Sequence, residues 1–164
     1  MKDRIAARTI LFAVLVCGSL AAVPGGLEAQ QASYEPATSG TRWLVGGNGF
    51  SIKLLVEASN LGGEEVELGE VTFPVGAGAR GGGHVHGRVE IFYILSGTFD
   101  HIVNGEAHRL TPGMVGIVRP GDEVIHRVVG DEPVRALVVW APAGEADRIA
   151  GGFEVRPIDD PPPF

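Results

Sequence analysis

The chain contains residues whose types and spacing could bind a metal ion. His84 and His86 are separated by one residue, and Glu90 follows four positions after the second histidine. Side chains alternate between the two faces of a β-strand, so these three residues share parity and can point the same way. Two imidazoles and one carboxylate on one face form part of a coordination shell for a divalent metal. His126 is the best candidate for a fourth ligand, because it lies in a predicted strand after a tight turn.

Glycines surround the first two histidines and favour an open site. Residues 78–83 read GARGGG, and a loop that is poor in Cβ atoms lets the backbone pass closely and leaves the mouth of a site accessible. The alternative is that His84 and His86 are surface histidines in a glycine-rich loop and that His126 is a core histidine. His101 and His108 have no ligand-like spacing, and we expect both to be exposed strand residues, with a place at the rim of the pocket as the alternative.

The residues after Glu90 predict what lines the interior. Phe92 and Ile94 share its parity, so we expect them to face the barrel interior near the metal and to form a substrate pocket that accepts an apolar or aromatic ligand. For Phe92 the bare residue pattern favours a plain core position as the alternative. Tyr93 has the opposite parity and is expected to face outward. Arg88 shares the parity of Glu90, which makes it the least typical surface arginine of this region.

The elements that must position these residues are short strands. Apolar runs alternate with Gly, Pro and Asn-Gly turns from residue 42 onward, as in RWLV, FSIKLLVEA, EVELGEVTF, VEIFYIL, TFDHIV, AHRL, VGIV, EVIHRVV and VRALVVWA. This rhythm predicts an all-β antiparallel sandwich or barrel. The sequence VNGEAH predicts a tight hairpin, and GEADRIA at most a weak helical turn. The tail RPIDDPPPF is too rich in proline to be expected in a sheet.

The ends of the 164-residue chain predict a single exported domain. Residues 1–29 have a basic start, an apolar run and a small residue at a cleavage point, which is typical of a signal peptide. We expect a flexible lead-in over 30–41, one β-barrel domain over 42–145 and a Pro-rich tail over 146–164. The apolar run is short for a membrane span. We therefore expect the protein to be periplasmic or secreted, with an uncleaved N-terminal anchor as the alternative.

Composition excludes one class of partner and constrains the ligands. The formal net charge is −7 and no basic run follows residue 8, which argues against nucleic-acid binding. The only cysteine, Cys17, lies inside the predicted signal peptide, so a metal would be held by nitrogen and oxygen atoms.

The spacing of these residues resembles the cupin superfamily. Gly78, His84, His86, Glu90 and Gly97 match its first motif without a gap, and GMVGIVRPGDEVIH, ending at His126, resembles its second motif with shifted spacing. The resemblance covers roughly residues 43–142. Within the superfamily, this segment is most similar to small single-domain, quercetin-dioxygenase-like cupins.

The resemblance implies a double-stranded β-helix, or jelly-roll barrel, and frequently a homodimer. It also implies that His84, His86, Glu90 and His126 hold one divalent ion (Fe, Mn, Ni, Cu, Co or Zn), leaving two octahedral positions open. In some such oxygenases the equivalent of Glu90 also moves a proton, so Glu90 is the candidate catalytic residue. Two functions are expected: a metal-dependent oxygenase-type enzyme on a small organic substrate, or a non-catalytic module that binds a small ligand.

Overall fold

The structure is a computed structural model that describes residues 39–163. The predicted signal peptide and the predicted lead-in up to residue 38 lie outside the described residues. The elements are β1 (Arg42–Val45), η1 (Gly47–Gly49), β2 (Ser51–Val56), α1 (Ala58–Leu61), β3 (Glu67–Phe73), β4 (His84–Val85), β5 (Val89–Ser96), β6 (Thr98–Val103), β7 (Glu106–Leu110), β8 (Val115–Val118), β9 (Glu123–Val129), β10 (Val134–Ala141), α2 (Glu145–Ala150) and β11 (Glu154–Pro157).

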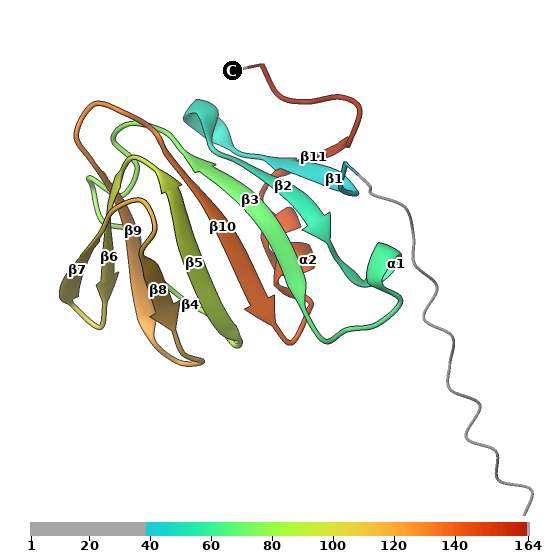
Figure 1. Ribbon diagram of the computed structural model, residues 1–164, viewed down its shortest axis with the longest axis horizontal. Helices are drawn as coiled ribbons and strands as arrows, with labels where there is room; N and C mark the ends of the chain where they lie inside the picture. Colours follow the sequence, from blue (N-terminus) through green and yellow to red (C-terminus); the bar gives the residue numbers. More distant parts are fainter. Residues whose placement is uncertain (1–38, 164) are drawn as a thin grey trace, which may run out of the picture. The chain divides into compact units, whose positions relative to one another are not determined.

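The strands form two antiparallel sheets. One has the order β11-β1-β2-β3-β10-β5-β8, and the other has the order β4-β9-β6-β7 and lies on the left of Figure 1. Neighbours in a sheet are often distant in sequence, as where β10 pairs with both β3 and β5. All nine apolar runs of the sequence form strands, which confirms the predicted all-β jelly-roll class.

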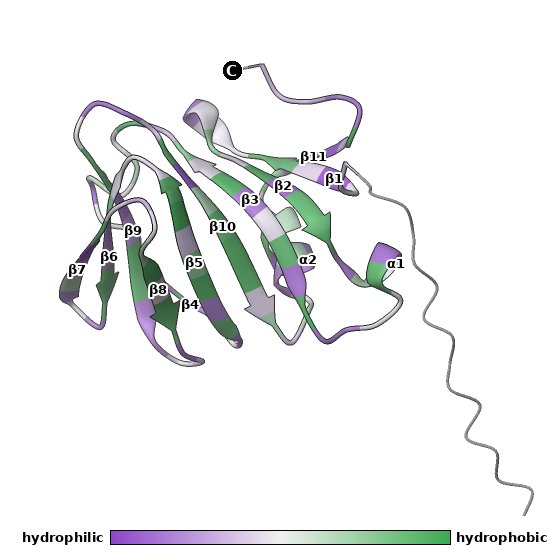
Figure 2. Ribbon diagram, viewed as in Figure 1, coloured by the Kyte–Doolittle hydropathy of each residue, from purple (hydrophilic) through white to green (hydrophobic). Residues whose placement is uncertain are grey.

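The core lies between the sheets because buried and exposed residues alternate along the central strands. In β10, Val134, Ala136, Val138 and Trp140 are buried, while the residues between them are more exposed. Apolar residues dominate β5 and β10 in Figure 2. Such alternation is the signature of a sheet with one face on the core. Tyr93 is 43% exposed, as its parity predicts.

The Asn-Gly turn forms the predicted hairpin. Asn104 and Gly105 both have positive φ, 49° and 83°, and join β6 to β7 with Val103 opposite Glu106. Two consecutive residues with positive φ are characteristic of the type I′ turn, whose twist matches that of the strands.

The C-terminal region departs from the sequence prediction. Arg156 and Pro157 were expected outside the sheets, yet they belong to β11 and pair with Trp43 and Arg42 of β1. Because β11 is an edge strand, the missing N–H of proline interrupts no central ladder. The weak turn expected at residues 144–150 is the helix α2, which lies behind β3 and β10 in Figure 1. In the described part of the chain, no helix has the length and apolar character needed to cross a membrane.

Candidate metal centre

The structure brings the four predicted ligands together from both sheets. His84 lies on β4, His86 directly follows it, Glu90 lies on β5 and His126 on β9. The Nε2 atoms of His84 and His86 are 2.9 Å apart. The Glu90 carboxylate lies between two of the imidazoles, with Oε2 3.1 Å from His86 Nε2 and Oε1 3.2 Å from His126 Nε2. Each of these four side chains therefore has a donor atom within 3.2 Å of the next, in the order His84, His86, Glu90 and His126.

Two of these donor atoms are buried without a hydrogen bond. Glu90 Oε1 and His126 Nε2 are close but not aligned for one, and neither has another partner. A buried polar atom left unsatisfied costs about 1–3 kcal/mol. Nitrogen and oxygen donors that converge while unpaired are suited to a divalent cation, so the residues present fit the metal that the motif implies.

Burial and neighbouring groups keep His84 and Glu90 in forms that can coordinate a metal, whereas His86 is shifted toward its protonated form. Burial lowers the pKa of His84 to about 4, and the nearby His126 and His86 act in the same direction, so the imidazole is neutral. Burial opposes ionisation of Glu90, but His126 and His86 outweigh it and hold the pKa of this carboxyl well below its ordinary value. Without a metal, the pKa of His86 is raised: burial works against this, and Glu90 and Glu145 outweigh it. Protonation of His86 therefore competes with metal binding at this ligand.

Two residues that the sequence analysis missed orient these ligands. The indole Nε1–H of Trp140 donates to Glu90 Oε2 at 2.8 Å. Glu145, fully buried on α2, lies with Oε1 2.7 Å from His86 Nδ1. Arg148 Nε donates to the same Oε1 at 2.6 Å and keeps the carboxylate paired. The contact at Nδ1 leaves His86 Nε2 directed at the other donors, and carboxylates commonly orient metal-binding histidines in this way.

A buried glutamate at the start of β3 fixes α2 in place. The carboxylate of Glu67 accepts the backbone N–H groups of Gly144, Glu145 and Ala146 at 2.8, 2.9 and 3.0 Å. These N–H groups begin the helix and have no partner within it, so the carboxylate takes the role of a capping side chain. Glu67 thereby sets where Glu145 meets His86.

A cavity of about 460 Å³ opens beside the donors. Phe92 lines it as predicted, whereas Ile94 packs in the core and does not line it, which corrects that part of the pocket prediction. Strand parity places both residues inside but does not fix their depth along the barrel. The other lining residues include mostly apolar side chains: Phe50, Ile52, Val71, Phe73, Ile125, Val138, Trp140, Ile149 and Phe153.

The glycine-rich loop, residues 74–83, borders this cavity and is held at one point. Val128 N donates to Ala77 O at 3.0 Å. A Cβ at Gly78, whose φ is +70°, would lie 2.1 Å from the carbonyl oxygen of His126. Gly81 and Gly82 also line the cavity, but a Cβ there would have no neighbour within 4 Å. Gly78 is thus required for close packing, whereas Gly81 and Gly82 leave open space.

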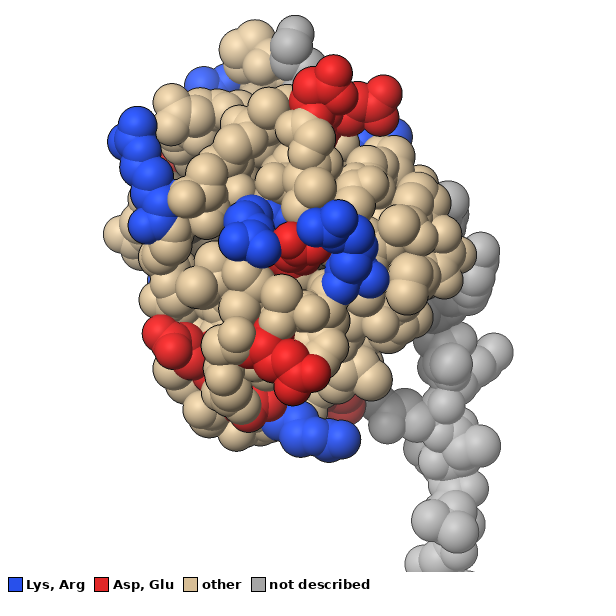
Figure 3. Space-filling view, turned by 90° about the vertical axis from the view of Figure 1, so that its left-hand side faces the viewer, with Lys and Arg blue, Asp and Glu red and all other residues tan. Residues whose placement is uncertain are grey.

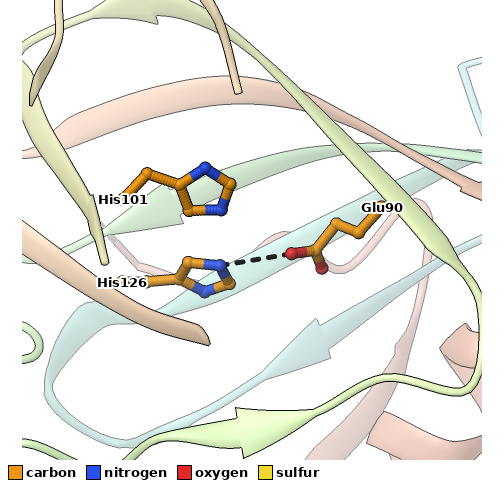
Figure 4. Close-up of side chains that lie close together, drawn as sticks. All are labelled: Glu90, His101 and His126. Carbon is orange, nitrogen blue, oxygen red and sulfur yellow. Dashed lines mark ion pairs between the residues drawn. The ribbon is translucent and has the colours of Figure 1, made fainter. Parts of the chain in front are cut away.

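His101 corrects the sequence prediction. It was expected to be exposed, but it is 1% exposed and lies next to His126, with ring centroids 5.3 Å apart. Figure 4 shows both rings beside Glu90. The shared parity of His101 with Phe99, which is fully buried, was a usable signal. His108 is exposed, as predicted.

Arg88 also departs from an ordinary surface arginine. Its Nε donates to Ala143 O at 2.7 Å, and its Nη1 lies 3.7 Å from Glu145 Oε2. Its parity with Glu90 had marked it as atypical. It braces the segment before α2 and does not line the cavity.

Comparisons with known proteins agree with this architecture. A family model described as a cupin domain matches residues 69–140, so Glu67, α2 and β11 lie beyond the match. KdgF from Halomonas sp. is similar with a TM-score of 0.54 and 20% identity over 64% of this chain and 91% of that one. An RmlC-like cupin from Shewanella frigidimarina has a TM-score of 0.52 and 20% identity over 70% and 96%. Ectoine synthase from P. lautus has a TM-score of 0.54 and 17% identity over 70% and 79%.

At these identities the likeness to solved structures shows the fold alone. No curated protein sequence matches the chain. The fold and the site together define a jelly-roll barrel protein with a buried cluster of histidine and glutamate donors. The cupin-domain match over residues 69–140 and the shared fold agree with the resemblance to the cupin superfamily seen in the sequence motifs.

Proposed function

We propose that this protein is a metal-dependent, oxygenase-type enzyme acting on a small, largely apolar organic molecule. The observation that carries the proposal is the convergence of His84, His86, Glu90 and His126 on the wall of an apolar cavity of about 460 Å³. A volume in this range accommodates a small organic ligand. The bound ion, one of Fe, Mn, Ni, Cu, Co or Zn, would supply Lewis-acid chemistry and, if redox-active, electron transfer.

The residues around the cavity have distinct tasks in this proposal. The apolar side chains exclude water and hold the hydrophobic body of the substrate. Glu90 is the proposed catalytic residue: Oε2 is fixed by Trp140, and Oε1 is the atom left for the ion or for a proton. Arg148 of α2 is the arginine among the residues that line the cavity, and it is the proposed contact for an anionic group of the substrate.

The test begins with the metal content of the purified protein and of the His86→Ala variant. The protein is then loaded with each metal, and oxygen uptake is measured across phenols, diketones and thiols. We expect near-stoichiometric metal in the wild type, none in the variant, and uptake with at least one combination. His108→Ala, an exposed histidine, is the matched control. Metal retained by His86→Ala would contradict the ligand assignment. Ligand binding without turnover under any metal would instead identify the non-catalytic binding module.

Export and self-association belong to the same proposal. Residues 1–29 are proposed to direct the chain to the periplasm or the medium, which N-terminal sequencing of the protein recovered from each compartment tests. Tyr93, Val115 and Ile117 form an exposed apolar strip on the outer face of β5 and β8, and this supports a homodimer. Sedimentation equilibrium distinguishes a dimer from a monomer.

A further inference from the structure

Three polar atoms that make no hydrogen bond meet at the inner end of the metal centre. In the part of the chain that the structure describes, Glu90 Oε1, His101 Nε2 and His126 Nε2 are all buried without a hydrogen-bond partner. The same three residues can each offer a ligand atom, all within 4.8 Å of one another. Buried polar atoms are nearly always paired, so their coincidence at one point indicates a group that bonds to all three.

The sheet directs His101 toward this point. On β6, His101 is directly opposite His126 of β9, so both side chains lie on the same face. The preceding residue, Asp100, faces outward and is 2.8 Å from Arg109 Nε on β7 and 2.7 Å from Arg127 Nη2 on β9. This outer face is the side viewed in Figure 3, where acidic and basic side chains lie next to one another. The ion pairs across three strands fix the register, and the alternation of faces then turns His101 inward.

A glycine in the facing sheet makes room for the ring. A Cβ at Gly116 on β8 would lie 2.4 Å from His101 Nδ1. The ring otherwise packs against aromatic groups, with centroids 5.7 Å from Phe92 and 6.0 Å from Phe99. Nothing in this setting satisfies Nε2, whereas a histidine kept only for packing would be expected to bond at this atom.

We propose that His101 is a further metal ligand, so that the ion has five protein donors: four imidazoles and the Glu90 carboxylate. The inference rests on the proposed metal site and changes its chemistry. With five donors from the protein, an octahedral ion keeps one position for water or a ligand, where the four-residue motif leaves two. A substrate would then reach the ion through one atom, with the rest of its body in the apolar cavity.

Cobalt(II) binding to the full chain tests this inference without any substrate. Affinity is measured by competition with a chromophoric chelator, and coordination by visible absorption, which strengthens as the number of ligands falls. We expect His101→Phe to bind cobalt at least about tenfold more weakly and to absorb more strongly. Gly116→Ala, which keeps the imidazole but displaces it, should shift both readouts in the same direction. His108→Phe, directly opposite His101 on β7 but exposed, should match the wild type.

The outcomes separate this inference from the proposed function. Unchanged affinity and absorption in His101→Phe would overturn it and assign His101 to the core, with a water bridging the unpaired atoms. Wild-type protein that binds no cobalt would overturn both proposals. Circular dichroism shows whether each variant is folded, and Gly116→Ala decides the question if His101→Phe is not.

Discussion

Replacing Glu145 tests whether α2 belongs to the metal centre. This buried carboxylate contacts His86 Nδ1 at 2.7 Å and lies outside the residues matched by the cupin model. Glu145→Gln keeps an oxygen that can accept the Nδ1–H but removes the charge. Glu145→Ala removes both. The two variants therefore separate the electrostatic part of the contact from its role in orienting the ring.

The expected magnitude follows from the type of contact. Hydrogen bonds to an ionised acceptor are roughly twice as strong as neutral ones, and loss of an outer-shell partner typically weakens metal binding about 10- to 100-fold. We expect Glu145→Gln to lose about tenfold in metal affinity, or about 1.4 kcal/mol of binding free energy. Glu145→Ala should lose about 100-fold, or about 2.7 kcal/mol. The burial of both side chains favours the full effect, since solvent cannot replace the lost partner.

Metal affinity is measured by chelator competition, with thermal unfolding of the metal-free protein as a check on folding. Glu154→Gln is the matched control, because Glu154 is exposed and pairs with Arg156 on β11. A Glu145→Ala variant that folds and binds metal within twofold of the wild type would refute the reasoning. Equal losses of metal affinity in the Gln and Ala variants would show that only the charge of Glu145, and not its hydrogen bond to His86, contributes to metal binding.

Three further predictions concern the surroundings of the site. Glu67→Ala leaves three N–H groups of α2 without their acceptor and should lower the free energy of unfolding by about 1–3 kcal/mol, measured in urea; an unchanged midpoint would count against the cap. Gly78→Ala should lower the free energy of unfolding by at least about 2 kcal/mol, because its Cβ meets the carbonyl of His126. Gly81→Ala, which has a similar φ but open space, should lower it by about 1 kcal/mol. Equal losses of stability in the two variants would contradict the close contact at Gly78. In metal-free protein, burial lowers the pKa of His101 from 6.5 to about 4, so below pH 6.5 the unfolded chain binds a proton that the folded chain does not. This residue should therefore lower the free energy of unfolding by about 3 kcal/mol as the pH falls from 6.5 to 4. The free energy of unfolding of His101→Phe, measured in urea, should depend less on pH over that range than that of the wild type. Equal pH dependence in the two proteins would exclude a lowered pKa of His101.

Strand parity predicted much of the site because it depends on local geometry alone. A period of two places Glu90 and Phe92 inside and Tyr93 outside whatever the barrel dimensions. The same argument does not fix depth, which is why Phe92 lines the cavity and Ile94 does not. The hairpin at Asn104 was predictable for a similar reason, since its backbone conformation is a local property.

The residues that were missed depend on contacts between distant segments. Glu145 lies 59 positions from His86 in a short helix, and no spacing rule connects them. Trp140 belongs to the apolar run VRALVVWA, which predicts only a strand, and its indole N–H meets Glu90 because β5 and β10 pair in that register. His101 had a local signal in its parity with Phe99, but its meaning depends on the space left by Gly116.

The glycine-rich loop lets access to the cavity vary independently of the metal ligands. Its border at Ala77 and Gly78 is fastened to β9 beside a metal ligand, while Gly81 and Gly82 line the cavity with open space around them. An alanine at Gly81 or Gly82 would take up space at the cavity wall without contacting a donor atom. The rates at which a ligand enters and leaves can therefore diverge among relatives while the ion is held equally tightly.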